Sequence, residues 1–399
     1  MRSRPPRSIA VIGAGVAGCG FVAALRQLGC EASLSLWEIG RGPGGRSGSR
    51  RSRGDAALVI DHGAPLLNLT AEPPPQLLEP LLAGGWIEPC ELRVATLQGE
   101  AHLSQGSADG LLAGRLYRGR GGMEQLCRGL LDLAGPAVES HFNSLVRDLS
   151  VDGAGRWQLC DAEGGVLQEA DWLVLSSTLL AHPRSQALLG WSAVPLRRVA
   201  AELGDLQLDH VLATIAGIRF EARSNLLLVL PAAAAAAWRA LPFDLLQFDP
   251  AAQQRWGLQR VLIQPLSDGR CAVVAHSSRT FAADHLSLYG EHSAVARLLG
   301  LPPDRERLAT AMAALEQQLL QALQPWLGSP SLEGADRQLM RWGAAFPVAP
   351  GLPSELCVCA ASGVGFCGDY VAGPGFGRIE GALRSAERLA SALAAAPAA

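Results

Sequence analysis

Lysine is absent from this 399-residue sequence, and all 34 basic residues are arginine. Lysine often acts as a general base or a Schiff-base nucleophile because its pKa falls readily on burial, whereas arginine stays protonated. Chemistry that requires a lysine base or a lysine imine is therefore excluded.

The sequence also lacks a surplus of positive charge and a long apolar run. A formal net charge of −3 provides no basic surface of the kind that binds a phosphate backbone, which argues against nucleic acid as a partner. The uncharged stretch 9–25 contains four glycines and is short for a membrane span. A strand, a turn and a helix account for the same residues, so we predict no membrane span.

The nine cysteines are odd in number and scattered over a chain large enough to fold without disulfides. This pattern is typical of the reducing cytosol, and we expect a cytoplasmic protein. Cys357, Cys359 and Cys367 lack the paired spacing and nearby histidines of a zinc site. We therefore predict no metal site and expect these thiols to be buried in a strand.

The apolar pattern predicts an α/β fold that begins with a Rossmann-like βαβ unit. Residues 8–12 are expected to form a buried parallel strand, 16–28 a helix and 33–38 a second strand. Residues 144–176 predict a small antiparallel meander that ends in a buried strand at 172–175.

The remainder of the chain indicates a second, mixed α/β domain. Strand-like runs occur at 211–220, 226–230, 259–264 and 271–276. A long helix is expected after them, at 305–327. Beyond Leu356 we expect a short strand, a glycine-rich loop at 363–377 and a terminal helix at 379–393. We predict a discontinuous dinucleotide-binding domain formed by residues 1–65, 117–190 and 346–399. The substrate domain is expected to consist of residues 66–116 and 191–345.

Gly13-Ala14-Gly15-Val16-Ala17-Gly18 is a G-x-G-x-x-G sequence between the first predicted strand and helix. There the first glycine permits a tight turn, the second lets backbone amides approach a pyrophosphate, and the third lets helix and strand pack closely. Glu38 follows Gly18 by about twenty positions, where a carboxylate accepts ribose hydroxyls and disfavours a 2′-phosphate. These residues predict FAD or NAD binding; a solvated glutamate at a strand end is the alternative.

Two further glycine-bearing loops follow. Gly44-Gly45-Arg46 is suited to run beside a cofactor, with a guanidinium that can bind phosphate oxygens in a bidentate manner. Asp61-His62-Gly63-Ala64 predicts another turn, in which His62 is either a base or a residue that caps the loop.

Together with Arg120-Gly121-Gly122-Met123, Leu126 and Gly368-Asp369, these motifs resemble the flavin-containing amine oxidase superfamily at both ends and in the middle of the chain. The stretches His276-Ser277-Ser278-Arg279 and Arg341-Trp342 are most similar to its renalase-like branch.

The resemblance implies an FAD that is held without a covalent bond, since no cysteine lies between Cys271 and Cys357, upstream of the Gly368-Asp369 pair. It implies that Arg46 contacts phosphate, Val146 adenine and Asp369 the ribityl phosphate region, while amides at Ile379 face flavin N1 and O2. The full set of implied cofactor residues is Gly13, Ala14, Gly15, Val16, Ala17, Gly18, Glu38, Gly44, Gly45, Arg46, Gly63, Ala64, Val146, Gly368, Asp369, Arg378 and Ile379.

The sequence departs from the amine oxidase pattern beside the flavin. There is no lysine to hold a water, there are only three tyrosines, and Arg378 precedes Ile379 where amine oxidases usually present an aromatic ring. A cation there repels a protonated amine and attracts an anion, unless Arg378 is only an exposed helix start. Trp342 is the second candidate for the catalytic pocket, with a packing role as the alternative.

The resemblance to renalase-like enzymes implies oxidation of a small reduced nitrogen heterocycle, such as an isomeric dihydronicotinamide dinucleotide, with FAD as hydride acceptor. Molecular oxygen or another acceptor would then receive the electrons. Such a hydride transfer requires positioning and no general base. The alternatives are a flavin amine oxidase or polyene desaturase and, from another class, a flavin-binding protein without turnover.

Overall fold

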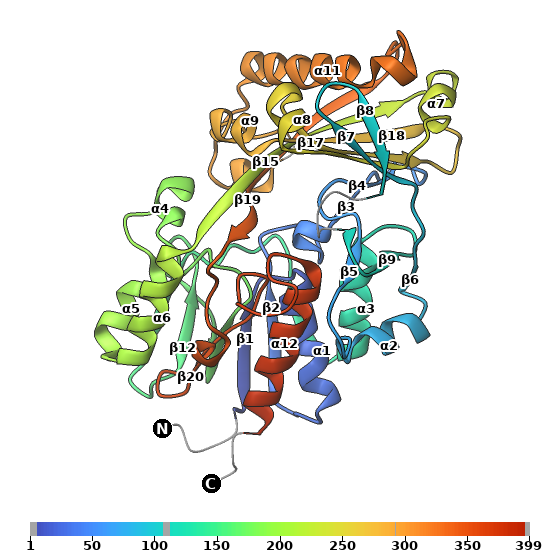
Figure 1. Ribbon diagram of the computed structural model, residues 1–399. Coiled ribbons are helices and arrows are strands. Elements are labelled where there is room, and N and C mark those ends of the chain that lie inside the picture. Colours follow the sequence, from blue (N-terminus) through green and yellow to red (C-terminus); the bar gives the residue numbers. More distant parts are fainter. Residues whose placement is uncertain (1–5, 107–111, 292, 396–399) are drawn as a thin grey trace.

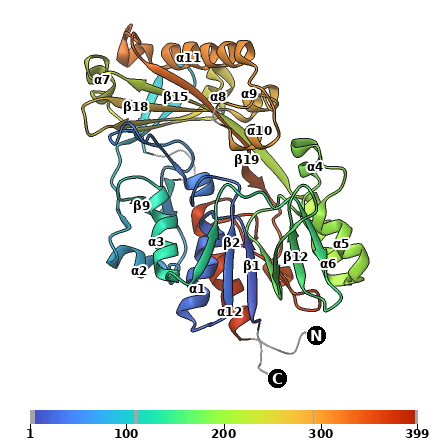
Figure 2. The same ribbon diagram turned by 180° about the vertical axis from the view of Figure 1, so that it is seen from behind.

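A computed structural model describes residues 6–106, 112–291 and 293–395, seen from opposite sides in Figures 1 and 2. Its lower half is built on a six-stranded sheet with the order β10-β2-β1-β14-β21-β20. β1 (Ser8–Ile12), α1 (Val16–Gln27) and β2 (Ser33–Trp37) form the expected βαβ unit, and β1 also pairs in parallel with β14 (Trp172–Leu175). The predicted α/β fold class is confirmed.

One face of this sheet is covered by α1, which packs against α12 (Ile379–Ala394) and α3 (Glu124–Ala134). Their apolar side chains, among them Phe21, Leu130 and Leu383, belong to one buried cluster. The first and last helices of the chain therefore lie side by side, which brings the glycine turn of residues 13–18 near the start of α12.

The other face carries the predicted meander and three helices, which share a second buried cluster. These elements are β11 (Asp148–Val151), β12 (Trp157–Cys160), β13 (Val166–Ala170), α4 (Arg184–Leu189), α5 (Pro195–Leu203) and α6 (Leu206–Gly217). The prediction of a strand at 211–220 was wrong for 211–217, which belong to α6; only Arg219 and Phe220 lie in a strand, at the start of β15 (Arg219–Leu230). Val211 and Ile215 recur at helical spacing on a buried face, and Asp205 caps α6 by accepting hydrogen bonds from backbone amides.

The glycine-rich segment after Leu356 also differs from expectation. Its beginning is not a loop but β21 (Val364–Phe366), which pairs in parallel with β14 and antiparallel with β20 (Val358–Cys359). A Cβ on Gly365 would lie 3.1 Å from the Leu389 side chain. A larger residue here would require the Leu389 side chain of α12 to shift by a few tenths of an ångström.

The cysteines of this region are buried, but only Cys359 lies in a strand; Cys357 and Cys367 lie just outside β20 and β21. Burial raises the pKa of the Cys357 and Cys359 thiols to about 12. Both thiols are thus protonated and unreactive at neutral pH.

The segment 66–116 divides between the two halves of the molecule. Beside α3 lie β5 (Leu67–Leu69), α2 (Leu78–Ala83), β6 (Ile87–Pro89) and β9 (Arg115–Gly119), while β7 (Val94–Gln98) and β8 (His102–Gln105) join the upper sheet. The predicted division into two domains stays a proposal. Within the segment 66–116, only β7 and β8 belong to the upper sheet. The remaining short elements of the lower half are η1 (Gly45–Ser47), β3 (Ser49–Arg51), β4 (Val59–Asp61), β10 (Val138–His141) and η3 (Ser354–Leu356).

The upper half is a seven-stranded sheet with the order β19-β15-β18-β17-β16-β7-β8. Its remaining strands are β15 (Arg219–Leu230), β16 (Leu245–Phe248), β17 (Leu258–Pro265), β18 (Cys271–Ser277) and β19 (Asp336–Val348). The long helix α11 (Arg305–Leu327) has the predicted bounds and packs on the outer face. Residues of the shorter helices α7 (Ala232–Arg239), α8 (Pro250–Trp256) and α9 (Arg279–Asp284) belong to the same buried cluster or pack on it. Val295 of α10 (Ala294–Leu298) instead packs on the second cluster of the lower half. Within the described ranges, no helix has both the length and the apolar character needed to cross a bilayer.

Gly18→Ala is expected to lower the free energy of unfolding by about 1–3 kcal/mol. A Cβ at residue 18 would lie 1.9 Å from the Gly13 carbonyl oxygen, so the turn would have to move. Urea unfolding followed by circular dichroism measures the effect. Gly20→Ala in the same helix is the control, since its Cβ would meet Ala386 at an ordinary 3.4 Å. Equal stability of the two variants would contradict the close packing of the turn.

Candidate functional site

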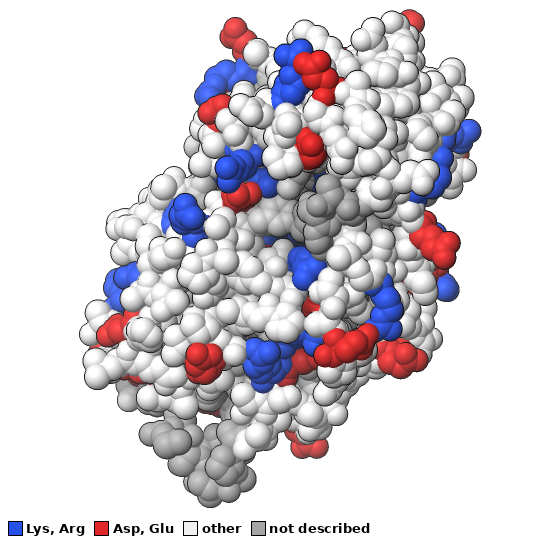
Figure 3. Space-filling view, in the orientation of Figure 1, with Lys and Arg blue, Asp and Glu red and all other residues white. Residues whose placement is uncertain are grey.

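A cavity of about 340 Å3 lies between the carboxyl ends of β1, β2 and β14 and the facing side of the upper sheet. Ligands commonly bind at this edge of an open α/β sheet. Figure 3 shows the surface hollowed where the two halves meet, with arginine and acidic side chains around the opening. Every cofactor residue predicted from the sequence lines this cavity except Ala14 and Gly18, and Trp342 lines it too.

The glycine turn forms one end of the cavity. Gly13 has a φ of +103° and Gly15 caps α1 in an extended conformation, so the first amides of α1 lie beside the cavity. The Gly44 amide donates to the Ala14 carbonyl at 2.8 Å, and a Cβ on Gly45 would lie 3.1 Å from the Gly15 Cα. Two loops thus approach as closely as backbones can, and the positive end of the helix is open to an anion.

Glu38 lies directly above this turn. One carboxylate oxygen accepts from the Ala14 amide at 2.8 Å and the other from the Gly40 amide at 2.6 Å. Burial raises the pKa of Glu38, and the two backbone hydrogen bonds act in the opposite direction. Each oxygen retains a further lone pair, so the carboxylate can still accept two hydroxyl groups.

Arg46 and Asp369 both line the cavity and form an ion pair with each other. The guanidinium makes two parallel hydrogen bonds to the carboxylate, at 2.6 and 2.5 Å, and a third to the Ala345 carbonyl at 2.9 Å. The sequence placed both residues near phosphate, but did not anticipate their pairing. The pair leaves Nε and one terminal N–H of Arg46 for a ligand.

The turn at 61–64 packs on the same loop. The Ala64 amide donates to the Arg46 carbonyl at 2.8 Å, and a Cβ on Gly63 would lie 2.0 Å from that oxygen. His62 is buried behind the turn, where its ring stacks on Trp342 with centroids 5.5 Å apart. Burial, with Arg50 nearby, lowers the pKa of His62 to about 4. His62 does not line the cavity, and it supports Trp342 instead of facing a ligand.

The upper sheet contributes a polar row that sequence reasoning missed. Asn225 on β15, His276 on β18 and Arg260 on β17 are register neighbours, so their side chains share one face of the sheet and all three line the cavity. Farther along the same strands this face is apolar, with Leu227, Leu262 and Val274 in one buried cluster. The polar row therefore begins where the sheet stops packing on protein and starts to wall the cavity.

The electrostatics of this wall are cationic at the arginines and neutral at the histidine. Burial lowers the pKa of His276 well below its ordinary value, and Arg260, Arg223 and His62 add to the effect. Arg223 faces the cavity two residues before Asn225 and is paired with Glu221 at 2.8 Å and Gln259 at 2.7 Å. At neutral pH, His276 can donate or accept a hydrogen bond but carries no charge.

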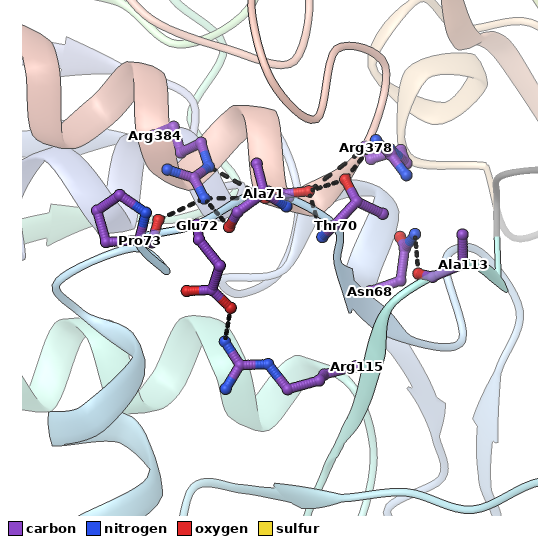
Figure 4. A network of polar contacts seen from close by, with 10 residues as sticks. Asn68, Thr70, Ala71, Glu72, Pro73, Ala113, Arg115, Arg378 and Arg384 are labelled. Atoms are coloured by element: carbon purple, nitrogen blue, oxygen red, sulfur yellow. Dashed lines mark hydrogen bonds and ion pairs between the residues drawn. The ribbon is translucent and has the colours of Figure 1, made fainter.

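Arg378 lies at the opposite edge of the cavity, at the start of α12 (Figure 4). Its guanidinium donates to the Thr70 hydroxyl at 3.0 Å and lies 3.9 Å from the Glu380 carboxylate. Glu380 is held by the Thr70 and Ala71 amides and by Arg384. Arg378 is therefore tied to this network and is not a free surface cation, although it borders the cavity.

The sequence contained a signal for the polar row. Polar residues border two apolar strand runs. Arg223, Ser224 and Asn225 precede the run that starts at Leu226, and His276 follows the run that ends at Ala275. A polar residue at an inward position of a buried strand requires a partner or a ligand. Only the pairing register, however, places these residues side by side.

The comparisons with known proteins agree with this arrangement. A family model described as an NAD(P)-binding Rossmann-like domain matches residues 11–79. No curated protein sequence matches the chain. A cyclohexylamine oxidase from Brevibacterium oxydans IH-35A superposes with a TM-score of 0.62 at 14% identity, over 98% of this chain and 99% of that one.

Two further solved structures cover similar lengths. A candidate protoporphyrinogen oxidase from Exiguobacterium sp. 255-15 gives a TM-score of 0.60 at 12% identity, over 99% of both chains. An oxidoreductase from Methanosarcina mazei gives 0.59 at 12% identity, over 95% of this chain and 98% of that one. The chain has the fold of these oxidoreductase structures. The predicted resemblance to the amine oxidase superfamily is thus supported at the level of fold, and the renalase-like branch stays a prediction.

The buried His276 predicts a pH dependence of stability. The pKa of His276 is lowered in the folded protein, whereas in the unfolded chain it is about 6.5. Below that pH the unfolded chain binds more protons than the folded protein. Stability therefore falls with falling pH, by up to about 1.4 kcal/mol per pH unit. His276→Gln should reduce the loss of stability between about pH 6.5 and about pH 5.5. Urea midpoints at the two pH values test this, and an unchanged slope would contradict the buried neutral ring. His102→Gln on the exposed strand β8 is the control.

Proposed function

We propose that the protein is an FAD-dependent oxidoreductase that holds its cofactor without a covalent bond. The observation that carries this proposal is that the Glu38 carboxylate, the glycine turn at 13–18 and the start of α12 all line one cavity. A dinucleotide has ribose, pyrophosphate and ring in that order, and the cavity offers a group suited to each. FAD, when bound, would supply a hydride acceptor at the interface of the two halves.

The residues present fit such a cofactor. Glu38 would accept the adenosine ribose hydroxyls with its two remaining lone pairs, and the first amides of α1 would receive the pyrophosphate. Val146 lies on the cavity wall, two residues after Ser144, whose amide donates to the Glu38 carbonyl. Ile379 opens a helix of 16 residues, whose amino-terminal amides favour negative charge on the distal ring.

The preferred substrate is a small reduced nitrogen heterocycle, such as an isomeric dihydronicotinamide dinucleotide. Support comes from the described lining of the cavity: the sequence has no lysine, and the pKa of the lining residue His276 is lowered so far that its ring is a poor proton acceptor at neutral pH. Hydride leaves a dihydropyridine without a general base, so the protein has only to stack and orient the ring. Trp342 and Phe346 provide apolar wall for that purpose, and Arg378 at the rim attracts the substrate phosphates.

An amine oxidase is the second candidate, because a cyclohexylamine oxidase has this fold. The charge of the cavity argues against it. Arg260 and the Glu221-paired Arg223 wall the substrate side, and a protonated amine close to the Arg260 guanidinium would be repelled, by an amount that grows as water is excluded.

Glu38→Ala is expected to weaken FAD retention by about tenfold or more, since the variant loses two charge-assisted acceptors for the ribose. The ratio of flavin to protein absorbance after gel filtration, and FAD titration of the stripped protein, measure this. Glu31→Ala in the exposed turn before β2 serves as the control. Wild-type flavin content in Glu38→Ala would refute the ribose assignment.

Anaerobic mixing distinguishes the candidate substrates. We expect the flavin absorbance to bleach with an isomeric dihydronicotinamide dinucleotide and to persist with cyclohexylamine or putrescine. Oxygen consumption on admission of air would identify oxygen as acceptor. Bleaching by amines alone would favour the amine oxidase, and a colour that no reductant alters would indicate a flavin-binding protein without turnover.

A further inference from the structure

We propose that Asn225 and His276 form a subsite that recognises a carboxamide group of the substrate, by one accepted and one donated hydrogen bond. The inference rests on the proposed function and deepens it, because it specifies which chemical group the cavity wall selects. The inference is based on three features of these two side chains: each has a fixed hydrogen-bonding role, both are buried, and they are neighbours in the polar row.

The hydrogen-bonding role of His276 is set by Arg260. Nδ1 of His276 lies 3.4 Å from a terminal nitrogen of Arg260. A guanidinium has only donors, so Nδ1 must be the acceptor. The ring is neutral because burial lowers its pKa, and its single proton therefore resides on Nε2. His276 thus offers a donor.

The role of Asn225 is fixed in the same way. Its Nδ2 lies 2.6 Å from the His62 carbonyl oxygen. A carbonyl only accepts, so this atom must be the amide nitrogen, and the side-chain oxygen Oδ1 is left as an acceptor. Asn225 thus offers an acceptor beside the donor of His276.

Neither of these two atoms has a hydrogen-bond partner within the described part of the chain. The two side chains are 0% and 2% exposed, and their residues are directly opposite each other on β15 and β18. Opposite residues in an antiparallel pair have Cβ atoms about 4.5–5.5 Å apart. A buried polar atom without a partner costs about 1–3 kcal/mol, so a ligand that satisfies both atoms at once gains specifically from them.

Three common groups can be compared at this pair. A protonated amine can donate to Asn225 but meets the N–H of His276 and the charges of Arg223 and Arg260. A carboxylate can accept from His276 but places an oxygen against Oδ1 of Asn225. A carboxamide has a carbonyl oxygen for His276 and an N–H for Asn225, and leaves neither atom unpaired.

A carboxamide is the substituent that a dihydronicotinamide ring carries. Held by the pair, it would fix the rotation of the ring against Trp342 on the neighbouring strand β19. Asn225 and His276 are thereby positioning residues: they orient the carbon that releases hydride and take no part in proton transfer.

Titration calorimetry of the flavin-loaded protein with four pyridines tests the inference. The probes are nicotinamide, 3-acetylpyridine, nicotinate and 3-(aminomethyl)pyridine, which differ only in the group offered to the pair. We expect nicotinamide to bind at least about tenfold more tightly than each of the others, since each leaves one buried atom unpaired. Equal affinities of nicotinamide and 3-acetylpyridine in the wild type would overturn the proposal.

Variants localise the effect. Asn225→Ala should reduce the preference for nicotinamide over 3-acetylpyridine to about onefold, because the amide N–H of nicotinamide then has no acceptor and the acetyl group no longer leaves Oδ1 unpaired. Asn68→Ala is the matched control, since Asn68 is another buried asparagine of the cavity wall, and it should keep the wild-type preference. A preference that survives Asn225→Ala would also overturn the proposal.

The outcomes distinguish failure of the carboxamide subsite from failure of the proposed function. If dihydronicotinamide bleaches the flavin but the four pyridines bind alike, the subsite is refuted and the proposed function stands. If no FAD is retained, the same titrations on the purified chain still report the preference for an amide. That preference would support the subsite, while the failure to retain FAD would refute the flavin-dependent reaction.

Discussion

The site depends on the double hydrogen bond between Arg46 and Asp369, which joins residues 323 positions apart. Arg46 follows the glycine loop after β2, Asp369 precedes α12, and the same guanidinium binds the Ala345 carbonyl of β19. One side chain thus connects both ends of the lower half to the upper sheet. Because such a pair stabilises only when its hydrogen bonds are complete, removing either partner leaves a charge with no counterpart.

The lining of the cavity offers two chemical environments. On one side, backbone amides and Glu38 present groups suited to a nucleotide. On the other, Arg223, Arg260 and a neutral His276 form the wall, and none of these three described side chains exchanges protons readily at neutral pH. An environment of fixed dipoles and unchanging charges favours reactions whose barrier is lowered by orientation over reactions that require proton transfer.

The lower part of the site could be predicted from sequence because its determinants are local. The turn at 13–18, Glu38, and the loops at 44–46 and 61–64 are short motifs whose spacing alone fixes their geometry. The upper wall could not be predicted, since Asn225, His276 and Arg260 become neighbours only through strand register. The errors at 211–220 and at β21 have a related origin: burial against distant elements decided between helix, strand and loop.

The placement of β7 has a consequence for how the chain is made. β7 pairs in parallel with β16, and Val94 lies opposite Leu245. During synthesis, β7 and β8 emerge long before the strand that they join. The hairpin must therefore wait, with unpaired edge groups, until the central strands of the upper sheet exist. The lower half requires β21 and α12, which follow every strand of the upper sheet in the sequence, so it can be completed only after the upper sheet has been synthesised.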